Sequence, residues 1–165
     1  MTQTKLDRPA LILEAASPKK EVRVARTQRG KRKQSERPAH DDLTVVVCRG
    51  GDCGSRRKHP DTDHQTQLSA LRSIARPGTR VLVSKCLDAC DHSNVVVVAP
   101  GADNVAQGEG AVWIGEANDA DTTTDIVRWV DEGGPGVSEM PVLVEIARFW
   151  PTRQSRRTLD SQHLI

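Results

Sequence analysis

The sequence predicts an α/β domain of roughly ninety residues between two polar flanking segments. Short β-branched runs alternate with two stretches of helical periodicity. Hydrophobic residues make up 36% of the chain and aromatic residues 2%, which is too little to bury a core along all 165 residues. We therefore expect a small mixed sheet of four strands, two main helices and poorly ordered tails.

Each expected element follows from a local pattern. The β-branched or aliphatic composition of four short runs favours strands. Leu68, Leu71 and Ile74 lie at helical spacing, and so do Ile126 and Val130. The predicted order is strand, helix, strand, strand, strand, helix, over residues 43–47, 64–75, 81–83, 94–99, 111–114 and 122–131.

Composition divides the chain into three parts. Residues 1–40 carry eleven Lys/Arg and four Asp/Glu, and we interpret them as a disordered basic arm. Residues 41–132 form the predicted domain, which ends before the Gly-Gly-Pro-Gly run at 133–136. Residues 133–165 are expected to be a linker, a short helix within 140–150 and a polar tail.

The positive charge of the basic arm would allow contact with nucleic acid or with an acidic partner, but the arm has no Phe, Tyr or Trp for base stacking. No apolar stretch reaches transmembrane length, and residues 1–17 lack the apolar core of a signal peptide. These observations predict a cytoplasmic protein without a membrane span. In a reducing cytosol, paired cysteines indicate a metal site or redox chemistry more often than structural disulfides.

The four cysteines form two close pairs, each after a predicted strand. Four residues separate Cys48 from Cys53, and three residues separate Cys86 from Cys90. Soft thiolate ligands in this number suit a [2Fe–2S] cluster or a structural zinc ion. A dithiol enzyme is a third reading, although its usual two-residue spacing is absent. Spacing alone favours the cluster and leaves the other two chemistries open.

Histidines near these cysteines are weaker candidates for ligands. His92 follows Cys90 in a Cys-x-His pattern that resembles half of a Rieske site, but no second half exists. His59 and His64 lie in a polar stretch, where we expect solvated side chains.

Three segments together resemble the thioredoxin-like [2Fe–2S] ferredoxins: CRGGDC, KCLDACDHSNVVVV and VWIGEANDADTTTDIVRWV. They are also similar to the small cluster-carrying subunit of respiratory complex I and to related hydrogenase and formate dehydrogenase subunits. The resemblance covers about residues 43–131. Relatives usually have glycine where this chain has Asp88.

The resemblance implies a thioredoxin-like fold and a [2Fe–2S] cluster, bound through Cys48, Cys53, Cys86 and Cys90 as metal ligands. It implies an electron carrier rather than an enzyme, or an accessory subunit of an oxidoreductase, with a redox partner protein. Relatives often dimerise, so a homodimer is a further expectation. The alternative is a non-redox adaptor, stabilised by zinc or a cluster, that binds a protein or nucleic acid through the basic arm.

Glycines and basic residues surround the cysteines. We expect the backbone N–H groups of Gly50, Gly51 and Gly54 to point toward the sulfurs. Basic residues close in sequence are expected to offset negative charge at the site and to steer an acidic redox partner; they are Arg49, Arg56, Arg57, Lys58 and Lys85.

Overall fold

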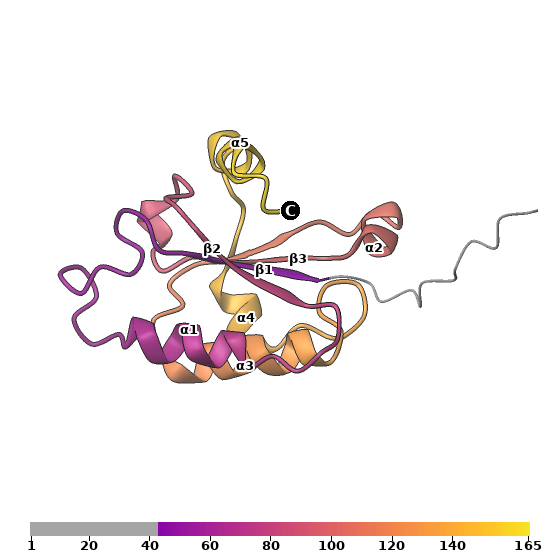
Figure 1. Cartoon of the computed structure of the whole chain (residues 1–165), viewed down its shortest axis with the longest axis horizontal. Helices are drawn as coiled ribbons and strands as arrows, with labels where there is room; N and C mark the ends of the chain where they lie inside the picture. The colour runs from indigo at the N-terminus through magenta and orange to yellow at the C-terminus, as the bar shows by residue number, and fades with distance from the viewer. Residues whose placement is uncertain (1–42) are drawn as a thin grey trace, which may run out of the picture. The chain divides into compact units, whose positions relative to one another are not determined.

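The computed structural model describes residues 43–165, so the predicted basic arm at residues 1–40 lies outside the described residues. The described part is a mixed α/β unit with one five-stranded sheet (Figure 1). Its elements run in the order β1 Thr44–Cys48, α1 His64–Arg72, β2 Arg80–Ser84, η1 Cys90–His92, β3 Val96–Ala99, α2 Ala102–Ala106, β4 Val112–Ile114, α3 Ala120–Asp131, α4 Val142–Ala147, β5 Arg148–Phe149 and α5 Arg153–Ser161.

The sheet has the strand order β2-β1-β3-β4-β5. Strand β1 pairs parallel to β2, whereas the β1–β3, β3–β4 and β4–β5 pairs are antiparallel. The parallel pair requires a crossover, and α1 supplies it. The mixed α/β class is confirmed, and each of the four predicted strands and two predicted helices has a counterpart in β1, α1, β2, β3, β4 and α3.

Side-chain alternation along the strands builds two cores, one on each face of the sheet. Val45 and Val47 point to the face covered by α1, α3 and α4, where Trp129 and Val144 are buried. On the opposite face, Val46 and Cys48 pack with a second set of buried residues, namely Cys53, Leu87, Val95, Val97, Trp113 and Leu159. Figure 1 shows α1 and α3 on one side of the sheet and α5 on the other.

The sheet has five strands rather than the predicted four, because β5 adds an edge strand beside β4. The short helix expected within 140–150 is α4, which begins after Pro141 and buries Val144. The region beyond it differs from the prediction, because α5 forms where a polar tail was expected. Helix α2 lies within the predicted loop at 101–110. Within the described residues, no helix has both the length and the apolar character needed to cross a membrane.

Candidate functional site

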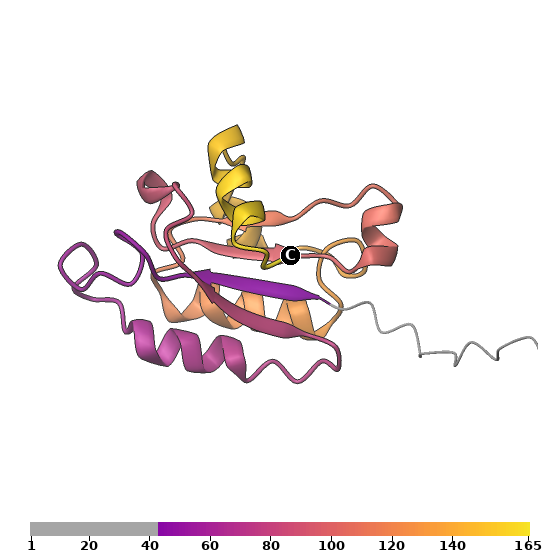
Figure 2. The ribbon, with the colours of Figure 1, turned by 45° about the horizontal axis from the view of Figure 1, so that its top comes forward.

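The two cysteine pairs lie at one end of the sheet because their strands are parallel neighbours. Cys48 is the last residue of β1 and pairs in register with Ser84, the last residue of β2. Cys53 lies in the turn that follows β1, and Cys86 and Cys90 lie in the loop and 3₁₀ turn that follow β2. Figure 2 shows the segments after β1 and β2 leaving the sheet at the same end. The sequence prediction that each pair follows a strand is confirmed.

Glycine allows the two loops to touch. A Cβ atom on Gly50 would lie 2.0 Å from the backbone nitrogen of Cys86, so only glycine fits there. Gly51 has φ +61°, and its Cβ would lie 3.2 Å from the sulfur of Cys90 and 3.4 Å from that of Cys86. The backbone at Gly51 therefore faces two sulfurs directly, in a space that a larger residue would fill.

The sulfurs are arranged in two pairs. The Sγ atoms of Cys86 and Cys90 lie 3.6 Å apart. Two thiolates on one tetrahedral metal ion lie about 3.7 Å apart when the metal–sulfur distance is about 2.3 Å. Cys48 and Cys53 form the other pair, and hydrogen bonding between their thiols affects both of their pKa values. The spacing of the second pair is therefore one that two thiolates on a single metal atom would take.

A single-ion cage is not evident at this site. Among residues 43–165, no three or more His, Cys, Asp or Glu side chains are grouped so that they could hold one metal ion. A structural zinc ion requires four ligands around one centre.

Hydrogen bonding separates the acidities of the first pair. The thiol of Cys53 lowers the pKa of Cys48 to about 6 by favouring its thiolate, against the opposing effect of burial. The same contact with Cys48, followed by burial, raises the pKa of Cys53. Within this pair the thiolate form is therefore favoured at Cys48 and the thiol form at Cys53.

In the second pair, the N–H of Asp88 donates to the Cys86 sulfur at 3.4 Å. This bond lowers the pKa of Cys86, but burial and the neighbouring Cys90 thiol outweigh it, so the net shift is upward. Asp88 adopts φ 56°, a left-handed conformation that favours glycine. The N–H of Gly54 was predicted to point toward the cysteine sulfurs. It donates instead to the side-chain oxygen of Asn94 at 2.7 Å, so this part of the prediction is wrong.

The five basic residues predicted around the site take different positions. Arg49 is half-buried and donates to the carbonyl oxygens of Cys48 and His64 and to the side chain of Gln67. Lys58 is exposed and donates at 2.9 Å both to Asp52 and to the carbonyl oxygen of Cys90. Arg56, Arg57 and Lys85 are exposed. Arg49 is thus a structural part of the first loop, while the other four lie on the surface.

The three histidines contact protein groups. The ring of His92 stacks on that of Phe149 at 4.1 Å between centroids. Nε2 of His59 lies 2.9 Å from the hydroxyl of Ser93. His64 is half-buried beside Asn94 and has a pKa lowered chiefly by burial. His59 and His64 therefore differ from the solvated side chains that the sequence predicted.

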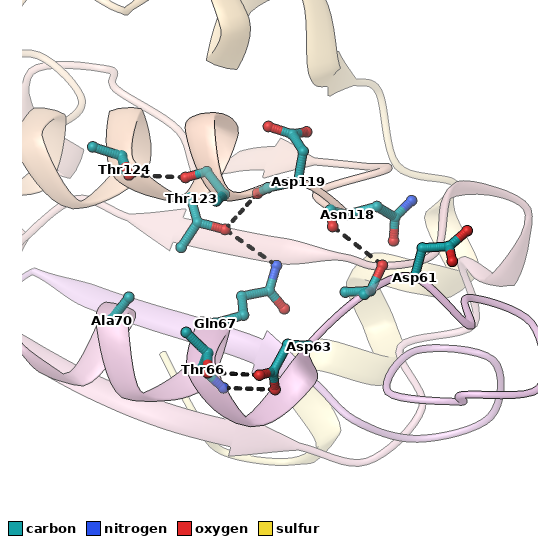
Figure 3. Close-up of a pocket in the computed structure, with 11 residues that line it drawn as sticks. Asp61, Asp63, Thr66, Gln67, Ala70, Asn118, Asp119, Thr123 and Thr124 are labelled. Atoms are coloured by element: carbon teal, nitrogen blue, oxygen red, sulfur yellow. Dashed lines mark hydrogen bonds between the residues drawn. The ribbon is translucent and has the colours of Figure 1, made fainter.

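A cavity of about 380 Å³ lies between the first turns of α1 and α3 (Figure 3). Two of its carboxylates, Asp63 and Asp119, accept hydrogen bonds from the N–H groups of their own helices. Gln67 spans the cavity and donates to the carbonyl oxygen of Ala117, while its side-chain oxygen accepts from Arg49 at 2.8 Å. The polar residues of this cavity therefore have structural roles. Asp63 and Asp119 cap their helices, and Gln67 supports the first cysteine loop through Arg49.

Sequence reasoning did not identify Ser155 and Gln162, which contact the second cysteine loop from α5. The available signal was weak. Thr152 followed three residues later by Ser155 is a possible helix start, and Leu159 is the single buried apolar residue that follows.

The fold and the site define a class: a mixed α/β unit that gathers four thiols at the carboxyl ends of two parallel strands. Comparisons of the chain with family models, with curated proteins and with solved structures found no match.

Proposed function

We propose that this chain is an electron-transfer protein with a thioredoxin-like fold that binds a [2Fe–2S] cluster through Cys48, Cys53, Cys86 and Cys90. The observation that carries the proposal is the pairing of four thiols at one end of the sheet, with the second pair 3.6 Å apart and Gly51 against both of its sulfurs. A [2Fe–2S] cluster bound by four thiolates accepts and donates one electron.

The protein would contribute rigidity and hydrogen bonds. Cys48 and Cys53 are buried on the core side, so water has little access to the first pair. Cys86 and Cys90 are half-exposed, and their side of the site is the natural face for a partner. The Asp88 N–H that donates to the Cys86 sulfur stabilises negative charge on that sulfur.

In this proposal the chain works with a redox partner, either as a separate carrier or as an accessory subunit of an oxidoreductase. The exposed cations Arg56, Arg57, Lys58 and Lys85 favour a partner with an acidic docking surface.

Anaerobic purification with analysis of iron, zinc and acid-labile sulfide tests the proposal. We expect equal amounts of iron and sulfide, a red-brown colour that dithionite partly bleaches, and an EPR signal in the reduced protein. Serine variants at Cys48 or Cys86 should lose most of the bound iron. A colourless protein with zinc and no sulfide, even after reconstitution, would instead favour the adaptor alternative.

A further inference from the structure

Helix α5 packs against the cysteine end of the sheet, on the face opposite α1 and α3 (Figure 1). Its inward residues are Ser155, which is 1% exposed, and Leu159, which is 2% exposed. Leu159 belongs to the same buried set as Cys48, Cys53 and Leu87. The helix is therefore part of the wall around the thiols.

Three hydrogen bonds join α5 and the residue after it to the second cysteine loop. The hydroxyl of Ser155 donates to the carbonyl oxygen of Asp88 at 2.8 Å. The side-chain oxygen of Gln162 accepts from the N–H of Lys85 at 2.9 Å, and its amide nitrogen donates to the carbonyl oxygen of Cys86 at 3.3 Å. Gln162 thus bonds to the N–H of Lys85 and to the carbonyl oxygen of Cys86, the backbone groups on either side of the peptide that joins these two residues.

These contacts fall where the loop conformation is least favourable. Asp88 has φ 56°, a conformation that non-glycine residues rarely adopt. The N–H of the same residue donates to the Cys86 sulfur. A hydrogen bond to the Asp88 carbonyl oxygen therefore helps hold a strained residue in the orientation that aims its N–H at the sulfur.

We propose that α5 is the positioning element of the second cysteine loop, and that Ser155 and Gln162 are positioning residues that fix the direction of the Cys86 sulfur and of the Asp88 N–H. The protein contacts alone carry this role of α5 in holding the loop, and the consequence for the reduction potential rests on the proposed function.

The test uses the full chain with Ser155→Ala, Gln162→Met and the double variant. Hydrogen exchange resolved to single amides should be at least tenfold faster at Lys85 in Gln162→Met, and at Asp88 in Ser155→Ala. Amides of β1 should be unchanged. In protein that carries a cluster, the reduction potential of both variants should fall, because a weaker N–H···S bond stabilises the reduced state less.

Matched controls lie on the same helix. The hydroxyl of Ser161 donates to the carbonyl oxygen of Thr158 within α5, and Gln154 is exposed. Ser161→Ala and Gln154→Met should leave exchange and potential unchanged. Gln162→Glu retains an acceptor for the Lys85 N–H but no donor for the Cys86 carbonyl oxygen, so it should restore slow exchange at Lys85 without restoring the potential.

The result that overturns the proposal is a double variant whose loop exchange matches that of the two controls. If Ser155→Ala fails to fold, Gln162→Met decides the question, because Gln162 is only half-buried. A wild-type protein without a cluster would overturn the proposed function and its redox consequence, while the exchange measurements would still decide whether α5 holds the loop.

Discussion

At the scale of single residues, the closest constraint on the site is the contact between Gly50 and Cys86. The 2.0 Å approach of a built Cβ to the Cys86 nitrogen means that any side chain at this position pushes the two loops apart. Gly50→Ala should therefore destabilise the protein by about 1–3 kcal/mol, as overpacking does, and should also impair iron binding.

Urea unfolding and iron content measure these effects. Gly110→Ala is the matched control, since a Cβ there meets nothing within 4 Å and should change neither quantity. Equal behaviour of the two variants would contradict the close packing of the two cysteine loops.

The unequal acidities of Cys48 and Cys53 predict a pH optimum for the stability of the reduced, metal-free protein. The pKa of Cys48 falls from its ordinary value of 9.0 to about 6 on folding, and that of Cys53 rises. Between pH 6 and 9 the unfolded chain binds a proton that the folded chain has lost, so the free energy of unfolding should rise with pH. Above pH 9 the folded Cys53 keeps its proton while the unfolded one loses it, so stability should fall again.

Urea unfolding over this pH range measures the profile. Cys53→Ala removes the hydrogen-bond donor to Cys48, and the rising limb should then become smaller. A profile that is identical in the two proteins would show that Cys53 does not set the acidity of Cys48.

At the scale of elements, the prediction succeeded where hydrophobic periodicity was strong. The valine-rich runs that became β1 and β3 are buried on both faces, and the first helix begins at His64 as expected. The predicted position of each cysteine pair after a strand is confirmed, and parallel pairing of β1 with β2 brings the two pairs to the same end of the sheet. In each case the local pattern and the tertiary packing require the same conformation.

The missed elements lack such a pattern. Strand β5 has only two residues and follows α4 directly, so no alternation can develop. Helix α5 buries one apolar side chain, Leu159, and its other main contacts are hydrogen bonds to loop backbone. Every residue other than proline has the same backbone N–H and C=O groups, so a side chain that bonds to backbone requires no particular residue type at the partner position. Ser155 and Gln162 could therefore not be recognised from the sequence.

The packing of α5 gives a prediction at the element scale. Leu159→Ala should cost about 2–5 kcal/mol of unfolding free energy, the usual range for a buried leucine. Because Leu159 packs with Cys48 and Cys53, the variant should also lose iron to a chelator faster than the wild type. Denaturant unfolding and absorbance decay measure the two effects.

Ile146→Ala is the control for this variant. Ile146 is 76% exposed, so its truncation should change stability by less than about 0.5 kcal/mol and should leave iron release unchanged. If Leu159→Ala and Ile146→Ala changed the unfolding free energy and the rate of iron release by similar amounts, the packing of α5 against the cysteines would not protect the site.

At the scale of the whole molecule, charge is distributed unevenly along the described part. Residues 43–165 have thirteen Lys/Arg and sixteen Asp/Glu, yet three successive exposed cations, Arg56, Arg57 and Lys58, lie in the loop that follows Cys53. Lys58 is paired with Asp52 at 2.9 Å, so Arg56 and Arg57 are the cations of this loop that we expect to attract anions and to orient an acidic partner.

This distribution predicts how reduced protein should respond to small oxidants of opposite charge. At low ionic strength an anionic complex such as hexacyanoferrate should react faster with Arg57 in place than in Arg57→Gln, whereas a cationic cobalt ammine should show the reverse. Stopped-flow rates should converge as added salt shortens the Debye length to a few ångströms.

Arg72→Gln is the matched control. Arg72 is also an exposed arginine, but it lies in the last turn of α1, at the end of that helix away from the cysteine loops. Equal rates for both oxidants with Arg57→Gln and Arg72→Gln at low salt would mean that the surface field does not guide electron exchange.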